Sequence, residues 1–248
     1  AMAAARSGAG AVTLLSPPNA MLVNAAHLIS IILREAGSLD EVMAFLDIRK
    51  PGALVFGPGI GTTDKVGVFA LDMMDAARDR VGAIVFDADA LTVLAKRRDV
   101  LAEKARAMGA PALVVTPHEG EFRRLFPELA DDPGLSKLER ARRAAALINA
   151  VVIYKGPDTV IAAPDGRAAI NSNGTPLLAT AGSGDVLCGI TAGLLAQGMP
   201  AFDAACAAVW MHAEAARRFG PGLIAEDLPL ALLPVLRELQ QLKPGPLP

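Results

Sequence analysis

Apolar residues fall into short continuous runs along the first two thirds of the chain, and longer amphipathic stretches separate these runs. The runs do not alternate with polar residues, which is typical of strands buried on both faces of a parallel sheet. They predict strands at residues 11–15, 53–56, 83–87, 112–116 and 151–155. The stretches between them predict helices at residues 19–34, 65–80, 92–108 and 136–149. This alternation predicts an α/β fold with a central, mostly parallel sheet flanked by helices on both faces.

The last third of the chain has a different pattern. Two short apolar segments flank Asp165-Gly166 and predict a β-hairpin made of residues 159–163 and 167–170. The sequence that follows predicts three helices, at residues 185–197, 203–219 and 227–241. Gly189 and Gly193 lie four residues apart in the first of these helices, and we expect them to permit close packing of another segment.

Composition narrows the class of protein. The 248 residues suffice for one large domain, and we expect residues 1–248 to form a single domain whose proline-rich tail, 243–248, frays. With a net charge of −2, the chain lacks the excess of basic residues that is typical of a nucleic-acid-binding protein. Two cysteines exclude a disulfide scaffold and favour a reducing, cytoplasmic location. No apolar run is long enough to span a membrane, and no export signal stands out.

Polar and glycine residues follow the predicted strands, and in open α/β sheets ligands bind at the carboxyl ends of strands. The segment GPGIG follows the strand at 53–56, and its Gly59 and Gly61 allow either a close approach to a ligand or a tight turn. It is not the G-x-G-x-x-G of a Rossmann dinucleotide loop. Asp87 and Asp89 follow the next strand and could hold a metal-bound water or a ligand hydroxyl, although Asp89 suits a helix N-cap equally well.

Two further strand ends carry charged side chains. In the segment TPHEGEF, His118 and Glu121 are three residues apart at a helix start, where they could bind a substrate and a magnesium-bound water. The alternative is a helix cap made by Thr116 and Glu119. Lys155 is the last residue of the strand predicted at 151–155, where its ammonium group could bind a phosphate or could simply be solvated. His212 lies in an apolar helix, and we expect it to be a packing residue.

The segment TAGSGD at residues 180–185 is the strongest local signal. Gly182, Ser183 and Gly184 lead into an apolar helix whose first amide groups lack partners and favour an anion. Asp185 beside such an anion site could accept the proton of an attacking hydroxyl, or could instead cap the helix. The patterns of P-loop enzymes and of serine hydrolases are absent. The combination suggests phosphoryl transfer.

Six segments together resemble one known family over about residues 7–239. They are GPGIG, DADAL, TPHEGEF, YKGPDTVIAAPDGRAAIN, NGTPLLATAGSGDVLCGITAGLLAQG and AEDLP. The chain resembles the ADP/ATP-dependent (S)-NAD(P)H-hydrate dehydratases, which have a ribokinase-like fold. The resemblance implies repair of (S)-NADHX or (S)-NADPHX, the hydrates of NADH and NADPH. In this reaction the ring hydroxyl is phosphorylated by ADP or ATP, and phosphate is then eliminated.

The resemblance also implies roles for individual residues. It makes Asp185 the catalytic aspartate, which also contacts the hydrate. Gly182, Ser183 and Gly184 match the anion hole, with Gly184 beside the nucleotide. The nucleotide-binding loop K-G-x-x-T corresponds to Lys155, Gly156, Pro157, Asp158 and Thr159. The substrate-binding positions are Gly59, Gly61 and His118, and the magnesium-linked acid is Glu121. Thr175 stands where the family often has an asparagine.

The start of the sequence departs from the family pattern. The family begins with a glycine-rich first strand, whereas the residues AMAAARSGAG resemble the end of a helix that began before residue 1. We therefore expect the chain to be cropped and its sheet to lack that strand. The resemblance further implies Mg²⁺, ADP as the co-substrate, a homo-oligomer such as a tetramer, and fusion or pairing with an NAD(P)H-hydrate epimerase. The alternatives are a kinase of a small alcohol such as a vitamin precursor, and a non-catalytic nucleotide-binding module.

Overall fold

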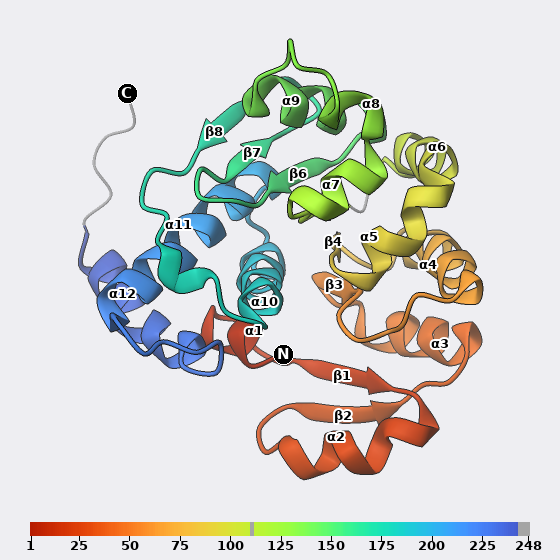
Figure 1. Cartoon of the computed structure of the whole chain (residues 1–248). Helices are drawn as coiled ribbons and strands as arrows, with labels where there is room; N and C mark the ends of the chain where they lie inside the picture. The colour runs from red at the N-terminus through yellow and green to blue at the C-terminus, as the bar shows by residue number, and fades with distance from the viewer. Residues whose placement is uncertain (110–111, 243–248) are drawn as a thin grey trace.

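A mixed sheet forms the centre of the computed structural model, which describes residues 1–109 and 112–242 (Figure 1). Its strands are adjacent in chain order, and the first four are parallel. The last two form the antiparallel hairpin expected around Gly166. The six strands are β3 (Ala53–Phe56), β4 (Ala83–Phe86), β5 (Ala112–Val115), β6 (Val151–Tyr154), β7 (Val160–Ala162) and β8 (Ala168–Ile170). The predicted tail at 243–248 lies outside the described residues.

Helices cover both faces of this sheet and bury two apolar clusters. One cluster is covered by α3 (Leu39–Arg49), α4 (Asp64–Ala77), α5 (Asp89–Leu94), α6 (Arg98–Met108), α7 (Glu119–Leu125), α8 (Pro127–Ala130) and α9 (Lys137–Ile148). The other is covered by α1 (Met2–Arg6), α10 (Ser183–Leu195), α11 (Ala201–Phe219) and α12 (Leu228–Gln241).

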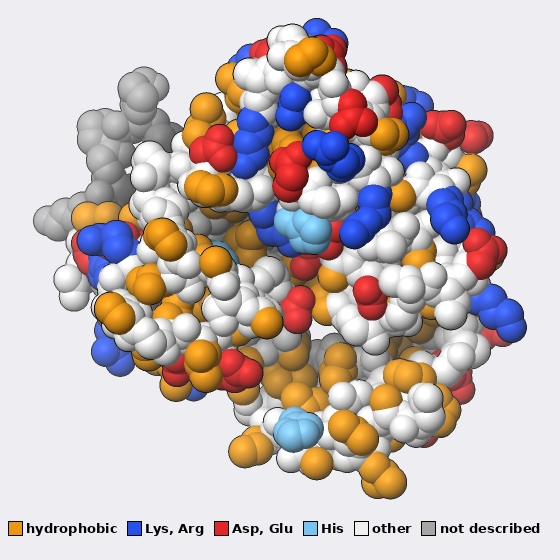
Figure 2. Space-filling model, viewed as in Figure 1, with side chains coloured by type: hydrophobic (Ala, Val, Ile, Leu, Met, Phe, Trp, Pro, Cys, Tyr) orange, Lys and Arg blue, Asp and Glu red, His pale blue; other side chains and the backbone are white. Residues whose placement is uncertain are grey.

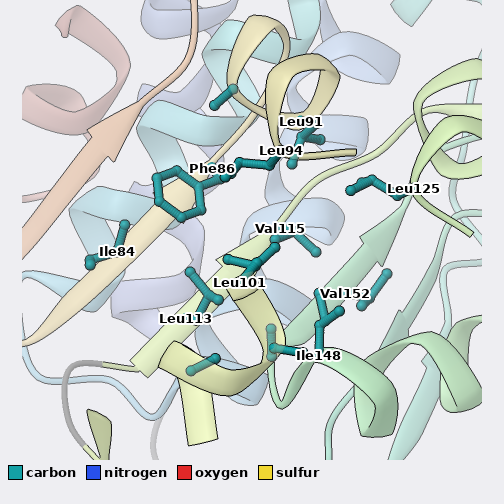
Figure 3. Packing of buried hydrophobic residues seen from close by; sticks show 14 of the residues in the cluster. Ile84, Phe86, Leu91, Leu94, Leu101, Leu113, Val115, Leu125, Ile148 and Val152 are labelled. Carbon is teal, nitrogen blue, oxygen red and sulfur yellow. The ribbon is translucent and has the colours of Figure 1, made fainter. Parts of the chain in front are cut away.

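Strand β4 shows why the apolar runs are continuous. Ile84 and Phe86 point into the first cluster, where they pack with residues of neighbouring strands and helices (Figure 3). Ala83 and Val85 point into the second cluster. Because successive side chains of a strand alternate between faces and both faces are covered, every residue of β4 is buried. The fold class predicted from the sequence is confirmed.

The segment before β3 differs from the prediction. Only residues 21–27 of the expected helix at 19–34 are α-helical, in α2 (Met21–His27), after a 3₁₀ turn, η1 (Pro18–Ala20). Leu28 then adopts an extended conformation, and β2 (Ile32–Glu35) pairs in parallel with β1 (Thr13–Ser16) in a separate two-stranded sheet. The physical reason is the cluster of Ile29, Ile31 and Ile32, because β-branched residues favour strands over helices.

Two other helices were predicted incorrectly. Helix α3 was not predicted, although Ser38 and Glu41 form a capping box at its start. The helix expected at 92–108 is divided into α5 and α6 by the 3₁₀ turn η2 (Ala95–Arg97). The single-domain organisation and the absence of a first strand stay predictions.

Helix α1 packs on α10 through the two glycines expected to permit close contact. A Cβ atom on Gly189 would lie 2.9 Å from the Cβ of Ala3, and one on Gly193 would lie 2.8 Å from the carbonyl oxygen of Ala4. Residues larger than glycine would therefore push α1 away. Among the described residues, no helix is both long and apolar enough to span a membrane. Cys188 and Cys206 are free thiols.

Candidate active site

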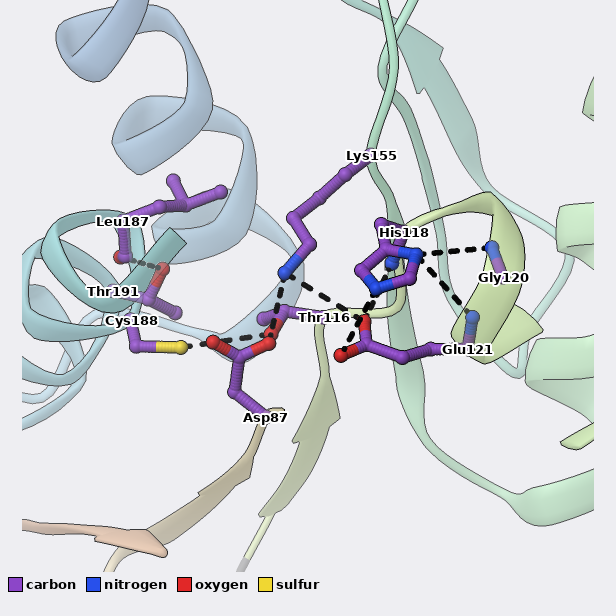
Figure 4. Close-up of polar contacts among 9 residues, drawn as sticks. All are labelled: Asp87, Thr116, His118, Gly120, Glu121, Lys155, Leu187, Cys188 and Thr191. Carbon is purple, nitrogen blue, oxygen red and sulfur yellow. Dashed lines mark hydrogen bonds and ion pairs between the residues drawn. The ribbon is translucent and has the colours of Figure 1, made fainter. Parts of the chain in front are cut away.

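A buried ion pair joins the ends of β4 and β6. The Lys155 Nζ atom lies 2.8 Å from Oδ1 of Asp87 and 3.8 Å from Oε2 of Glu121, near the start of α7 (Figure 4). The hydroxyl of Thr116, at the end of β5, donates a 2.6 Å hydrogen bond to the same Oδ1 atom. Asp87 is only 1% exposed. Lys155 is therefore part of a buried polar cluster and is not the solvated lysine that the sequence allowed.

The charges in this cluster perturb one another's ionisation. Burial alone would raise the pKa of Asp87, but the charge and hydrogen bond of Lys155 and the hydroxyl of Thr116 lower it below its ordinary value. Burial would lower the pKa of Lys155, but the charges of Asp87 and Glu121 raise it. Burial raises the pKa of Glu121, and the charge of Lys155 opposes this shift only in part. The cluster thus holds a charged Lys155–Asp87 pair.

His118 caps helix α7. Its Nδ1 atom accepts hydrogen bonds of 2.9 Å from the Gly120 amide and 3.3 Å from the Glu121 amide. The Glu121 carboxylate in turn accepts a 2.8 Å bond from the His118 amide, which completes a capping box. The cap proposed for Thr116 and Glu119 was therefore assigned to the wrong pair. Glu119 instead accepts a hydrogen bond from the hydroxyl of Tyr154.

The first turn of α10 has the geometry of an anion site. Gly182 is the N-cap residue with φ = +83°, and no side chain caps the helix. The hydroxyl of Ser183 is not directed at the first turn, because it donates to the carbonyl oxygen of Leu178. A Cβ atom on Gly184 would lie 3.3 Å from the Nζ atom of Lys155. The glycine therefore lets an ammonium group approach the positive end of the helix dipole.

Asp185 stands in the first turn of α10 and is exposed to solvent. It does not cap the helix, since α10 has no side-chain cap. Partial burial raises the pKa of Asp185, and the negative charge of Asp87 raises it further, whereas Lys155 lowers it. A carboxylate with a raised pKa at an anion site is suited to accept a proton.

The predicted nucleotide loop lies between β6 and β7. Thr159 closes it, because its hydroxyl oxygen accepts a 3.2 Å bond from the Gly156 amide and donates a 2.9 Å bond to the Gly156 carbonyl. Asp158 pairs with Lys137 at 2.7 Å, and this hydrogen bond lowers the pKa of the aspartate. A Cβ atom on Gly174 would lie 2.5 Å from the carbonyl oxygen of Pro157. The loop is thus held against the segment that leads to α10.

The glycine loop after β3 is fixed to the neighbouring strand end. Gly59 and Gly61 have φ values of +70° and +83°, and the Gly61 amide donates a 2.9 Å bond to Oδ2 of Asp89. Helix α5 begins at Asp89 with Ala88 as its N-cap, so the N-cap role considered for Asp89 is wrong. Neither loop glycine has a heavy atom within 4 Å of where its Cβ would stand, which leaves space for a ligand.

The donor atoms available to a metal ion are carboxylate oxygens. Among residues 1–109 and 112–242, no group of three or more His, Cys, Asp or Glu side chains could hold a metal. Asp87 and Glu121 nevertheless approach the same ammonium group beside the anion site. Mg²⁺ prefers oxygen ligands and usually keeps several waters, so these residues fit an ion that phosphates and water help to hold.

The structure brings most of the predicted site residues to one end of the sheet. Asp87 was predicted only to hold a metal-bound water or a ligand hydroxyl, and its bond to Thr116 was not predicted. The signal was present, because Asp87 and Thr116 each follow a buried apolar run. Strands β4 and β5 are parallel neighbours, so their ends lie side by side. His212 is buried in α11, as expected of a packing residue, and burial lowers its pKa to about 4.

A model of the NAD(P)H-hydrate dehydratase family matches residues 1–233. The chain belongs to this family. It is 43% identical over 208 residues to the bifunctional NAD(P)H-hydrate repair enzyme Nnr of Gloeobacter violaceus, covering 82% of this chain and 38% of that protein. It is 39% identical over 179 residues to the ADP-dependent (S)-NAD(P)H-hydrate dehydratase of Neisseria meningitidis, covering 72% of this chain and 58% of that protein. The chain thus spans only part of the length of these dehydratase-family relatives.

Solved structures agree with the fold expected for this family. The ADP/ATP-dependent NAD(P)H-hydrate dehydratase of Bacillus subtilis, co-crystallized with ATP/Mg²⁺, superimposes with a TM-score of 0.73 at 27% identity, covering 96% of this chain and 82% of that chain. A ribokinase-like superfamily protein of Enterococcus faecalis has a TM-score of 0.77 at 21% identity, covering 96% of this chain and 80% of that chain, and it bears on the fold alone. The ribokinase-like fold predicted from the sequence is confirmed.

Proposed function

We propose that this protein catalyses the ADP-dependent dehydration of (S)-NADHX and (S)-NADPHX to NADH and NADPH. The observation that carries the proposal is Asp185 at the uncapped start of α10, where a Cβ on Gly184 would lie 3.3 Å from the Lys155 ammonium group. This site places a carboxylate that can accept a proton beside N–H groups that can donate hydrogen bonds to a phosphoryl group. Membership of the NAD(P)H-hydrate dehydratase family supports the choice of substrate.

In the first step Asp185 accepts the proton of the hydrate's ring hydroxyl, whose oxygen attacks the terminal phosphorus of ADP. An oxygen–phosphorus bond forms, the bond to the leaving oxygen of AMP breaks, and AMP departs. The amide groups at the start of α10 and the ammonium group of Lys155 stabilise the negative charge of the transferred group. Mg²⁺, when bound near Asp87 and Glu121, neutralises phosphate charge.

In the second step the phosphorylated hydrate loses phosphate and a proton from adjacent ring carbons, which restores the ring double bond. The nucleotide binds along the loop of Lys155, Gly156, Pro157, Asp158 and Thr159. The hydrate lies against Gly59, Gly61 and His118, next to Asp185. Glu121 would help to hold the metal ion through a water molecule. We further infer that the enzyme is homo-oligomeric and cytoplasmic. We also infer that it works with an epimerase, and the word bifunctional in the names of several relatives supports this partner.

The test measures the return of NADH absorbance from (S)-NADHX with ADP or ATP in the presence of Mg²⁺. We expect turnover with ADP and release of AMP, and we expect Asp185→Asn to reduce the rate at least about 100-fold. Asp203→Asn is the matched control, because Asp203 is an exposed aspartate in the first turn of the neighbouring helix α11. It should leave the rate unchanged.

Other outcomes would identify other functions. Accumulation of a phosphorylated small alcohol without dehydration of the hydrate would favour an alcohol kinase. Calorimetric binding of ADP without turnover of either substrate would favour a nucleotide-binding module. An Asp185→Asn variant as active as the parent protein would reject the proposed role of this residue.

A further inference from the structure

A hollow lies beside α7, away from the Lys155–Asp87 pair. It has a volume of about 340 Å³ and lies between the turn η2 with the start of α6 and the end of α7 with the start of α8. Its charged lining residues are Lys96, Arg97, Arg98, Arg124, Asp99 and Glu128. The whole chain has a net charge of −2, whereas four of these six side chains are basic. Basic side chains gather on the part of the face that lies over α5, α6 and α7 (Figure 2).

Two of these cations are already neutralised. Arg97 pairs with Asp64 at 2.6 Å. Arg98 pairs with Glu128 at 2.5 Å, lies 3.7 Å from Asp99 and donates a hydrogen bond to the carbonyl oxygen of Leu125. These contacts fix the two guanidinium groups as a wall of the hollow.

The other two cations have charge to offer a ligand. Lys96 and Arg124 are exposed, and neither makes an ion pair with any residue in the described part of the chain. They come from separate elements, η2 and α7, and both line the same hollow. Two exposed cations that line one hollow, beside two paired ones, can bind a compact dianion.

The hollow is connected to the proposed active site along α7. A Cβ atom on Gly120 would lie 4.0 Å from Nη2 of Arg124. The Gly120 amide donates to Nδ1 of His118, the residue proposed to bind the hydrate. One helical segment therefore carries His118 at its start and Arg124 near its end. Cε1 of His118 lies 3.0 Å from the same Cβ position, so the hollow begins beside the residue proposed to bind the hydrate.

We propose that this hollow binds the 2′-phosphate of (S)-NADPHX, with Lys96 and Arg124 as its ligands; this inference rests on the proposed function. A phosphate monoester carries about −1.5 to −2 charge near pH 7. It can therefore form two charge-assisted contacts that the 2′-hydroxyl of (S)-NADHX cannot form. Asp99 and Glu128 also line the hollow, but both carboxylates lie against Arg98, whose charge offsets part of their repulsion of a phosphate.

The experiment compares kcat/KM for the two hydrates in the parent protein and in the double variant Lys96→Gln/Arg124→Gln. We expect the value for (S)-NADPHX to fall about tenfold, while the value for (S)-NADHX stays within about twofold. Arg143→Gln is the matched control, because Arg143 is an exposed arginine on α9, outside this hollow. It should change neither value.

A second measurement does not depend on turnover. ADP-ribose with a 2′-phosphate should compete with the hydrate more strongly than plain ADP-ribose, and the double variant should remove this difference. An equal loss for both hydrates would overturn the proposal in favour of a contact with the pyrophosphate. An unchanged ratio of the two kcat/KM values would overturn it outright. In either case continued turnover of (S)-NADHX would leave the proposed function standing, whereas no turnover of either hydrate by the parent protein would reject that function.

Discussion

The ammonium nitrogen of Lys155 lies 2.8 Å from Oδ1 of Asp87, across the end of the strand between them. Asp87 follows β4 and Lys155 follows β6, while Thr116 at the end of β5 donates to the same carboxylate. Three neighbouring strand ends are thus tied together by one carboxylate. This arrangement holds the carboxyl ends of the three strands together and also sets the charge of the proposed phosphoryl-transfer site.

We expect Lys155→Met to lower both stability and activity. The substitution leaves the buried charge of Asp87 without its partner, which costs about 3 kcal/mol of unfolding free energy. It also removes a cation from the anion site, so the rate of hydrate dehydration should fall about 100-fold or more. Urea unfolding and the ADP-dependent assay measure the two effects.

The double variant Lys155→Met/Asp87→Leu separates these effects. Removing both charges avoids an unpaired buried ion, so stability should recover relative to Lys155→Met. Activity should stay low. A double variant less stable than Lys155→Met would contradict the explanation by an unpaired buried charge.

We expect Asp185→Asn to make the protein slightly more stable near pH 7. The folded-state pKa of Asp185 is raised, so the charged carboxylate is less favourable in the folded than in the unfolded chain. The gain should shrink as the pH falls through the folded pKa, because the aspartate is then protonated in the folded protein. Solvent screening at this exposed position keeps the gain below about 1 kcal/mol. Thermal unfolding of both proteins at several pH values gives the comparison, and a destabilised Asp185→Asn variant would contradict it.

The acid limb of the rate profile should lie at a higher pH than an ordinary aspartate would give. A proton acceptor works only when deprotonated, and the pKa of Asp185 is raised by burial and by the charge of Asp87. Activity should therefore decline as the pH falls through this raised pKa. The acid limb of the residual activity of Asp87→Asn should lie at lower pH, because this variant lacks the negative charge that raises the pKa of Asp185. The dependence of kcat/KM on pH tests both statements, and a limb that stays in place would assign it to another group.

We expect Gly189→Leu to destabilise the protein by about 1–3 kcal/mol through steric overlap with α1. The Cβ atom alone would lie 2.9 Å from the Cβ of Ala3. Gly10→Ala is a suitable control, since a Cβ at Gly10 has no heavy atom within 4 Å. Chemical unfolding gives both values. Equal stability of the two variants would mean that α1 does not pack on α10 in solution.

The strands of the main sheet could be predicted because their apolar runs are continuous and both faces are covered, as in β4. The end of α2 could not be predicted, since its amphipathic pattern continues past His27. Residues 32–35 beyond it pair with β1, a long-range interaction that a local pattern does not contain. The start of α3 was predictable from Ser38 and Glu41 and was missed.

The same contrast holds at the site. Lys155 and Asp185 are recognisable from the residues around them, because glycines mark both segments. The partner of Lys155 is 68 residues away in the chain, and only the parallel order of β4, β5 and β6 places Asp87 beside it. Which loop carboxylate would pair with the lysine was therefore not contained in the sequence pattern.

The cap of α7 also determines which tautomer His118 adopts. Its Nδ1 atom accepts two backbone amides and so carries no proton in the neutral ring. The proton of the neutral imidazole must then reside on Nε2, which lies 3.5 Å from Oε1 of Glu121. The ring thus joins the start of α7 to the carboxylate of Glu121, so a change of tautomer would cost the helix its cap.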